Sequence, residues 1–339
     1  AAAFGDSTVY VERLVPSARH IEVQVAGDAS GHVLVLGDRD CSLQRRRQKI
    51  VEVAPAPRLT KAQRDALAAH SIALAKAVAY QGLGTVEFLL GADGFLAFIE
   101  FNARLQVEHT VTEAVTGLDL VRLQFDIANG ASLTDFEVPV ARGLAIQARV
   151  NLETMQADGS AKPGGGRLNV FEPPAGPGIR VDHFGYAGYK TSPRYDSMLA
   201  KVIVHAATGD MAVAAAKTSR ALAEFRLEGA ASNISFLQCL LDRPEWRDYA
   251  FDVDFVEREV TNILEAIAEA PRRHFQPDAP VDAGARANLA GAQIDAADPL
   301  AVLAHGKAED SAPVRGGISG AEDVDGHVLR APMPGAIVS

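Results

Sequence analysis

The segment FIEFNARLQVEH, residues 98–109, alternates between polar and apolar side chains. From residue 100 onward its even positions carry carboxylates, amides and a guanidinium: Glu100, Asn102, Arg104, Gln106 and Glu108. Period two predicts one extended segment with a packed face and a polar face. A solvated strand face is the simpler alternative, but such faces favour Thr, Lys and Ser. The polar row is therefore a candidate site.

The upstream segment GTVEFLLGADGFLAFIE has two apolar runs separated by Gly-Ala-Asp-Gly, which predicts a hairpin. Pairing Leu90 with Phe95 places Glu87 diagonal to Glu100 and on the same face as Asn102, with diagonal neighbours about 7 to 8 Å apart. Two carboxylates this close repel each other unless a cation lies between them. Oxygen ligands suit Mg²⁺ or Mn²⁺ shared with nucleotide phosphates, so the hairpin predicts a phosphoryl-transfer site.

A basic cluster, CSLQRRRQKIVE at residues 41–52, contrasts with the acidic balance of the whole chain. The sequence has 33 Lys and Arg against 43 Asp and Glu, a formal net charge of −10, which disfavours a nucleic-acid surface. A solvated charge run is one interpretation of the cluster. Its place between two strand-like segments favours the other, an anion site for phosphate or a small carboxylate.

The length of 339 residues predicts two domains. No run of 18 apolar residues is present, and the N-terminus lacks the features of a signal peptide. The two cysteines, Cys41 and Cys239, are far apart and have no metal-ligand spacing, so we expect neither zinc nor a disulfide framework. These features predict a cytoplasmic protein.

Strand, helix and hairpin patterns follow one another without a repeating βαβ unit, which predicts an α+β fold. Strands are expected over residues 8–38, starting with TVYVERLV. A helix is expected over 59–80 with Thr60 as its N-cap, and one or two further helices over 112–130, closing at Gly130. The Ala, Asp, Gly and Pro content towards the C-terminus predicts a connector.

Taken in order, seven blocks of the sequence resemble the biotin carboxylase component of biotin-dependent acyl-CoA and pyruvate carboxylases, which belongs to the ATP-grasp superfamily. The blocks are VYVERL, SARHIEVQV, GDRDCSLQRRRQK, GTVEFLL, FIEFNARLQVEHTVTE, IQARVN and YDSMLAKVIV. The resemblance implies the C-terminal lobe of an ATP-grasp domain, with an antiparallel sheet, in residues 1–135, and a biotin carboxylase C-terminal domain in 142–257. A linker is expected over 258–330, and APMPGAIVS at 331–339 resembles the first strand of a biotinyl carrier domain.

The resemblance implies a ligase that carboxylates biotin with ATP and bicarbonate through carboxyphosphate. The implied cofactors are ATP, Mg²⁺ or Mn²⁺, and biotin on a carrier domain. The implied partners are carrier and carboxyltransferase domains or subunits in a homo-oligomer, with no nucleic acid and no membrane. The family's N-terminal domain and most of its lid would precede Ala1, and the biotinylated lysine would follow Ser339. We therefore expect this chain to be a fragment that is inactive alone.

The resemblance also assigns roles by position. The metal-binding positions match Glu87, Glu100 and Asn102. Glu87 and Glu100 count among the nucleotide-contacting positions, together with Glu12, Val15, His20 and Gln44. The bicarbonate pocket matches Lys49, Arg104, Gln106 and Val107. The catalytic positions match Glu108 as the general base, Arg104, and Arg149, which would contact biotin and stabilise its enolate.

Two positions depart from the family pattern. Arg47 stands where His or Asn is usual, and Thr110 stands where Pro is usual. Two alternatives to biotin carboxylation stay open: another ATP-grasp ligase similar to carbamoyl phosphate synthase, and a non-catalytic assembly module. RLQVEH and Arg149 favour biotin carboxylase over the first, and the intact polar row disfavours the second. The final acyl acceptor is not encoded in this segment.

Overall fold

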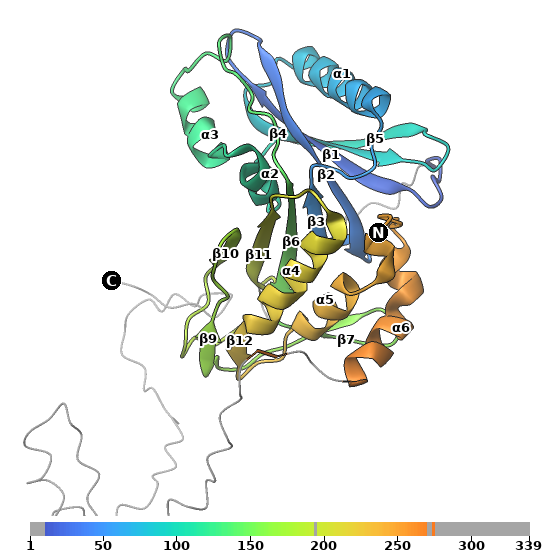
Figure 1. Ribbon diagram of the computed structural model, residues 1–339. Helices are drawn as coiled ribbons and strands as arrows, with labels where there is room; N and C mark the ends of the chain where they lie inside the picture. Colours follow the sequence, from blue (N-terminus) through green and yellow to red (C-terminus); the bar gives the residue numbers. More distant parts are fainter. Residues whose placement is uncertain (1–10, 193–194, 270–272, 275–339) are drawn as a thin grey trace, which may run out of the picture. The chain divides into compact units, whose positions relative to one another are not determined.

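An antiparallel sheet of eight strands runs through the protein in the computed structural model, in the order β10-β11-β6-β3-β2-β1-β4-β5 (Figure 1). The structure describes residues 11–192, 195–269 and 273–274. The strands in chain order are β1 Arg19–Gly27, β2 Val33–Arg45, β3 Gln48–Ala54, β4 Gly82–Leu90, β5 Leu96–Asn102, β6 Leu144–Asn151, β7 Glu153–Met155, β8 Ala161–Pro163, β9 Val170–Glu172, β10 Ile179–His183, β11 Met198–Ala206 and β12 Arg226–Glu228. Strands β7 and β8, and likewise β9 and β12, form two small separate sheets.

Six α-helices are present in the described residues, so the expected mixture of helix and antiparallel sheet is confirmed. They are α1 Lys61–Ala77, α2 His109–Thr116, α3 Leu120–Ala128, α4 Met211–Glu224, α5 Ile234–Leu241 and α6 Phe255–Glu269. The expected pattern over 112–130 is two helices, because Gly117 adopts a left-handed conformation between them. Gly130 does the same beyond α3, where the sequence predicted the end of the pattern.

The main sheet crosses the boundary between the two predicted domains. Strand β3 comes from the first and β6 from the second, yet the two pair directly, with Val51 opposite Ala148 and Val53 opposite Ile146. The chain segments on either side of the boundary therefore share one hydrogen-bonded ladder.

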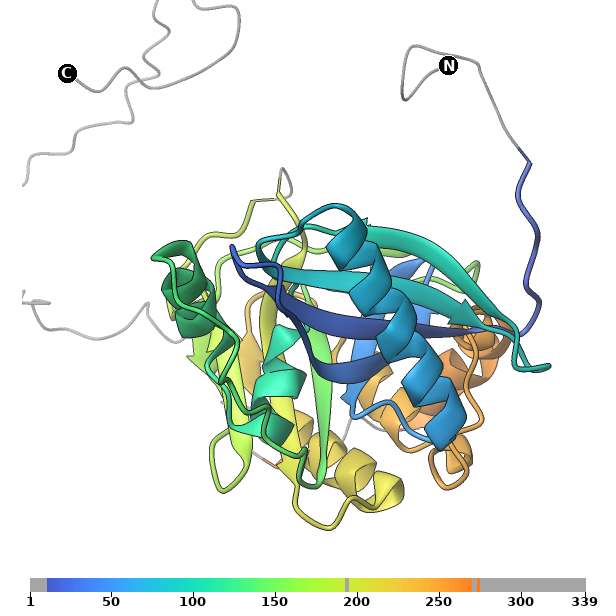
Figure 2. The same ribbon diagram turned by 90° about the horizontal axis from the view of Figure 1, so that it is seen from above.

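The two faces of this sheet have different chemistry. On β6, Ile146 packs in a large apolar cluster with α4 residues such as Ala214, whereas its neighbour Ala145 packs with Val111 of α2. Successive side chains of a strand point to opposite faces, so α2 and α4 cover opposite sides of the sheet. Figure 2 shows α1 lying across the sheet, and Leu67 of α1 joins the apolar cluster of β1 and β4. The face under α2 carries the polar side chains described below.

Three expectations about elements are wrong. Residues 11–15 are not a strand, and Val11 is 99% exposed; residues 8–10 lie outside the described part. The extended segment predicted over residues 98–109 stops at Asn102, because the chain turns through 103–108 and α2 begins at His109. The predicted packed face of this segment is also incomplete, since Ile99 is 41% exposed. The linker does not begin at residue 258, because α6 continues to Glu269 and buries Val260. The rest of the linker and the expected carrier strand at 331–339 lie outside the described residues.

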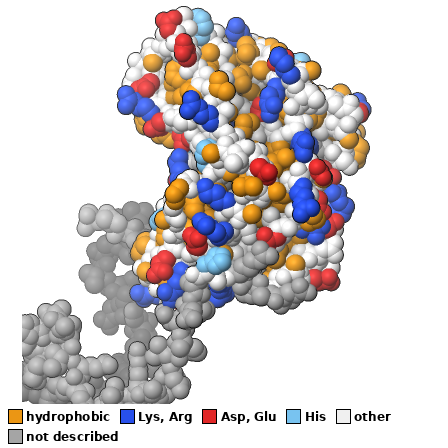
Figure 3. All heavy atoms as spheres, in the orientation of Figure 1, with side chains coloured by type: hydrophobic (Ala, Val, Ile, Leu, Met, Phe, Trp, Pro, Cys, Tyr) orange, Lys and Arg blue, Asp and Glu red, His pale blue; other side chains and the backbone are white. Residues whose placement is uncertain are grey.

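No helix in the described residues is long and apolar enough to cross a membrane. On the face drawn in Figure 3, Lys and Arg side chains are interspersed with acidic and apolar ones.

Helix α1 begins with the predicted cap. The Thr60 hydroxyl accepts the Gln63 amide (3.2 Å), and the Gln63 side chain accepts the Thr60 amide (2.9 Å). Because this reciprocal pair satisfies two amides at the helix start, we expect Thr60→Ala to lower the free energy of unfolding by about 1 kcal/mol. Urea denaturation of the 339-residue chain measures the change. Thr261→Ala, at an exposed position inside α6, is the control and should be neutral or slightly stabilising. Equal destabilisation by both would contradict the capping role.

Candidate active site

A cavity of about 600 Å³ collects most of the residues that the sequence singled out. The predicted residues that line it are His20, Lys49, Glu87, Glu100, Arg104, Gln106, Val107, Glu108 and Arg149. They come from strands β1, β3, β4, β5 and β6 and from the turn before α2. The prediction that Lys49, Arg104, Glu108 and Arg149 open into one cleft is confirmed.

The β4–β5 hairpin brings the two predicted carboxylates together, although its register differs from the prediction. Leu90 pairs with Leu96 rather than with Phe95, and a β-bulge then places Glu87 directly opposite Glu100 instead of diagonal to it. The Asn102 amide nitrogen donates to both carboxylates, at 2.9 Å to Glu87 and 2.7 Å to Glu100. Their convergence on one point is confirmed. The two converging carboxylates fit a hard divalent cation such as Mg²⁺ or Mn²⁺, whereas Asn102 presents its amide nitrogen to them rather than its oxygen.

Of these three side chains, Glu87 makes the most contacts. Its carboxylate receives the Gln106 amide at 2.6 Å and the Lys49 ammonium at 3.1 Å, and His20 Nε2 lies 2.6 Å away. Burial by itself raises the pKa of Glu87, but the contacts with His20 and Lys49 outweigh it and lower the pKa to about 2. Glu87 is therefore ionised at neutral pH and is available as a cation ligand.

Lys49 is the common partner of three carboxylates. Its ammonium lies 3.1 Å from Glu87 and 2.9 Å from Glu108, and it also donates to Glu22. Burial lowers the pKa of Lys49, but the carboxylates, with Glu22 first among them, raise it overall. The permanently charged Lys49 ammonium therefore links Glu87, a member of the Glu87–Glu100 pair, to Glu108, the candidate base.

Glu108 is held between two cations. It is 2% exposed, and its oxygens accept from Lys49 at 2.9 Å and from the Arg149 guanidinium at 3.1 Å. Arg149 also donates to Glu52, at 2.5 Å, and these two carboxylates raise its pKa against the effect of burial. Arg104 lines the same cavity but is exposed, and its guanidinium donates to the Leu105 carbonyl at 3.4 Å. Of the two predicted catalytic arginines, only Arg149 forms an ion pair with Glu108 in the described residues.

Sequence reasoning missed the buried support of the site. Glu22, Arg39 and Glu52 are all 0% exposed. Arg39 donates to Glu22 (2.9 Å), to Gln24 (2.8 Å) and to three further oxygens at 3.1 Å. The signal was present, because HIEVQV on β1 and IVEV on β3 place single polar residues among apolar ones.

Three predicted nucleotide residues and one metal residue do not line the cavity. Glu12 is exposed in the irregular segment before β1, and Val15 packs beside Gly91 at the β4–β5 turn. Gln44 is buried under the site and contacts His20 Nδ1 at 2.6 Å. Asn102 reaches the site only through its contacts with Glu87 and Glu100.

The basic cluster at residues 41–52 is divided by a tight turn between β2 and β3. Arg45 is buried and pairs with Glu153 at 3.5 Å, whereas Arg46 and Arg47 have positive φ angles and are exposed. Arg47, the departure from the family pattern, lines the cavity and lies 3.4 Å from Asp254 near α6. The cluster therefore contributes Arg45, Arg47 and Lys49 to the cavity wall.

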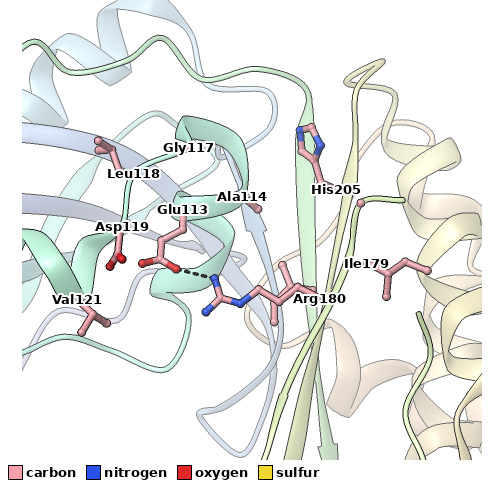
Figure 4. A pocket seen from close by; sticks show the side chains of 11 residues that line it. Glu113, Ala114, Gly117, Leu118, Asp119, Val121, Ile179, Arg180 and His205 are labelled. Carbon is pink, nitrogen blue, oxygen red and sulfur yellow. Dashed lines mark hydrogen bonds and ion pairs between the residues drawn. The ribbon is translucent and has the colours of Figure 1, made fainter. Parts of the chain in front are cut away.

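A larger cavity, of about 670 Å³, lies beside the junction of α2 and α3 (Figure 4). Glu113 of α2 and Arg180 of β10 face each other there, at 2.7 Å. None of the site residues predicted from the sequence lines this cavity. Size alone does not identify a site, and the convergent charged groups assign it to the smaller cavity.

We expect the free energy of unfolding at acid pH to depend on the ionisation of the Glu22 side chain. Burial by itself raises its pKa, but Lys49 and then Arg39 lower it from its usual value of 4.5 to about 2. A lowered pKa contributes stability above pH 4.5 that is lost as the pH falls towards 2. We expect Glu22→Gln to cost roughly 3 kcal/mol at pH 7, because it removes the buried negative charge that Arg39 and Lys49 share, and to flatten the acid limb of the stability curve.

Urea denaturation of the 339-residue chain between pH 7 and pH 3 measures both effects. Asp65→Asn is the control, since Asp65 forms an exposed pair with Lys61, and it should shift stability by less than about 0.5 kcal/mol. Parallel stability curves for the wild type and Glu22→Gln would contradict the pKa assignment.

Two family models match the chain. The model "Carbamoyl-phosphate synthase L chain, ATP binding domain" matches residues 1–136, and "Biotin carboxylase C-terminal domain" matches residues 147–258. Among curated relatives, the biotin-dependent acyl-coenzyme A carboxylase alpha3 subunit of Mycobacterium leprae is 40% identical over 358 residues, covering 99% of this chain and 58% of that protein. Human mitochondrial pyruvate carboxylase is 47% identical over 261 residues, covering 76% of this chain and 22% of that protein.

A solved structure with the same fold is the biotin carboxylase domain dimer of the Hydrogenobacter thermophilus 2-oxoglutarate carboxylase, in complex with MgADP, ADP and bicarbonate. It is 38% identical, with a TM-score of 0.69, over 74% of this chain and 55% of that chain. The present chain thus covers little more than half of the mycobacterial subunit and of the Hydrogenobacter chain, and about a fifth of human pyruvate carboxylase. The chain therefore belongs to the biotin carboxylase family through the two segments that these models match, and its relatives include biotin-dependent acyl-CoA and pyruvate carboxylases.

Proposed function

We propose that the 600 Å³ cavity is the part of a biotin carboxylase active site in which bicarbonate is activated with ATP and passed to biotin. The observation that carries the proposal is the convergence of Lys49 and Arg149 on Glu108, beside the Glu87–Glu100 pair. The cations Lys49 and Arg149 can attract an anion to this cavity, and the Glu108 carboxylate beside them can accept its proton. Bicarbonate is such an anion.

Glu108 is the proposed general base. Bicarbonate is a poor nucleophile until it loses its proton, and a positioned carboxylate can accept that proton. Lys49, Arg104, Gln106 and the backbone at Val107 would hold the bicarbonate; all four line the cavity with Glu108. The bicarbonate oxygen that has lost its proton attacks the γ-phosphate of ATP, and carboxyphosphate forms with loss of ADP. Arg149 would then contact the ureido group of biotin and stabilise its enolate.

Glu87, Glu100 and Asn102 would hold Mg²⁺ or Mn²⁺. When bound, the ion would neutralise charge on the ATP phosphates. His20 and Gln44 would contact the nucleotide from β1 and β2, and Glu12 and Val15 would do so from the segment before β1. For Glu12, Val15 and Gln44 the support is positional only, since none of the three lines the cavity.

The proposed partners follow from the relatives. Carrier-bound biotin would be the carboxyl acceptor, and a carboxyltransferase domain or subunit would use the product. Assembly as a homo-oligomer and a cytoplasmic location are parts of the same proposal. The match with the mycobacterial subunit covers 99% of the chain, and this supports a chain in which carboxylase and carrier segments are joined.

Glu108→Gln tests the proposal in the complete carboxylase that contains this chain. Losing the general base should lower bicarbonate-dependent ATP hydrolysis in the presence of biotin by at least about 100-fold. Glu172→Gln, at a side chain that is 64% exposed on β9, is the matched control and should leave turnover unchanged. Undiminished turnover in Glu108→Gln, with an unchanged melting temperature, would contradict the base assignment.

The same preparation separates the alternatives. Carbamoyl phosphate formation from ammonia, with no response to biotin, would favour the ligase similar to carbamoyl phosphate synthase. Absence of any ATP hydrolysis in the complete protein would favour the assembly module.

We further expect the 339-residue chain alone to turn over ATP far more slowly than the complete carboxylase, because enclosure of the triphosphate is part of the rate. An assay of the purified chain with ATP, Mg²⁺, bicarbonate and free biotin measures this. The complete carboxylase is the positive control. Turnover of the chain near that of the complete enzyme would contradict this expectation.

A further inference from the structure

A buried chain of polar side chains links the start of helix α2 to Arg149. The Thr110 hydroxyl donates to Gln147 Oε1, and Gln147 Nε2 donates to Glu52 Oε2 at 3.0 Å. The other oxygen of Glu52 accepts from Arg149 Nε at 2.5 Å. Thr110, Gln147 and Glu52 are each 0% exposed, so water cannot replace any of these partners.

The direction of every hydrogen bond in this chain follows from chemistry. Burial raises the pKa of Glu52, and the adjacent Arg149 guanidinium opposes this shift. As a carboxylate Glu52 accepts on both oxygens, so Gln147 presents its amide nitrogen to Glu52 and its amide oxygen to Thr110. A buried amide oxygen needs a donor, and the Thr110 hydroxyl supplies it. Without that hydroxyl, the buried Gln147 Oε1 loses its donor and the amide is held only from the Glu52 side, so it can move and weaken its bond to the second oxygen of Glu52.

The chain closes on itself through the candidate base. Arg149 donates from Nε to Glu52 and from its terminal nitrogen to Glu108 at 3.1 Å. Glu108 lies two residues before Thr110, at the start of α2. The ring therefore has two attachments to the same helix turn, one through the base and one through the Thr110 hydroxyl.

We propose that Thr110 and Gln147 are positioning residues that fix the Arg149 guanidinium against Glu108 through Glu52. The proposal rests on the proposed function, because Arg149 and Glu108 are assigned there as the groups that meet biotin and bicarbonate. Thr110 is the position where this chain departs from the family's usual Pro, and Pro has no hydroxyl to complete the ring. The plainer role, in which the Thr110–Gln147 bond only fastens α2 to β6, predicts a different experimental result.

Thr110→Val and Thr110→Ser distinguish the two roles in the complete carboxylase. Val keeps the shape and removes the donor, and Ser keeps the donor. Positioning predicts that Thr110→Val lowers kcat for biotin carboxylation roughly tenfold, with the KM for ATP unchanged, because small displacements of reacting groups are costly. Thr110→Ser should restore kcat to within about twofold of the wild type. A lower melting temperature with wild-type kcat in Thr110→Val would overturn the proposal.

A second measurement does not depend on activity. In the 339-residue chain with isotope-labelled arginine, the Nε–H resonance of Arg149, assigned with Arg149→Lys, reports its bond to Glu52. We expect Thr110→Val to shift this resonance and to speed its exchange with water, and Thr110→Ser to leave both near the wild type. Gln147→Met breaks the same chain from the strand side, and it replaces Thr110→Val should that variant not fold.

These readouts separate the failure of this inference from the failure of the proposed function. An Arg149 resonance that is unchanged in Thr110→Val and in Gln147→Met overturns the positioning role, whatever reaction the site performs. A shifted resonance in a protein whose wild type lacks bicarbonate-dependent ATP hydrolysis keeps the positioning role and removes the proposed reaction.

Discussion

The burial of carboxylates around one ammonium is the constraint on which the site depends. Lys49 alone lies within 3.1 Å of Glu87 and Glu108 and also donates to Glu22. Carboxylates this close can all stay ionised only if cations lie between them, because burial by itself favours their protonated forms. Arg39 and Arg149 supply two more positive charges, so three permanent cations face four buried carboxylates once Glu52 is included. Glu100, which is exposed, adds a further negative charge opposite Glu87. The site is therefore negative at the β4–β5 hairpin, and this favours a divalent cation there.

This charged row explains why the two faces of the sheet differ. On β1, Ile21 and Val23 pack in the apolar cluster joined by α1, whereas the intervening Glu22 bonds with Arg39 on the opposite face. Fully buried charges cost several kcal/mol each unless they are paired, so the polar face needs a partner for every member. Arg39, with five acceptors, meets this requirement under α2. The apolar face supplies the hydrophobic burial, and the polar face supplies the chemistry.

Period two and turn chemistry predicted much of this from the sequence. The hairpin, the shared face of Glu87 and Glu100, and the Thr60 cap all follow from local rules. The bulge that places those carboxylates directly opposite each other does not, because no turn residue in the sequence marks it. The end of β5 at Asn102 was missed because alternation continues through a turn in which the side chains are positioned by tertiary contacts, such as Gln106 with Glu87. Long-range partners such as Glu52 with Arg149 cannot be found from local spacing.

The shared sheet also limits how the site can move. Glu87 and Glu108 come from the segment before residue 136, and Arg149 comes from the segment after 147, yet all three belong to one site. The β3–β6 ladder joins the two segments, with four residue pairs from Val51 to Ala54. A hinge between them would break these backbone hydrogen bonds, whose loss in a buried sheet is costly. The distance between Glu108 and Arg149 is therefore set by the sheet and finely adjusted by side chains, which is the reason a single hydroxyl beneath them can matter.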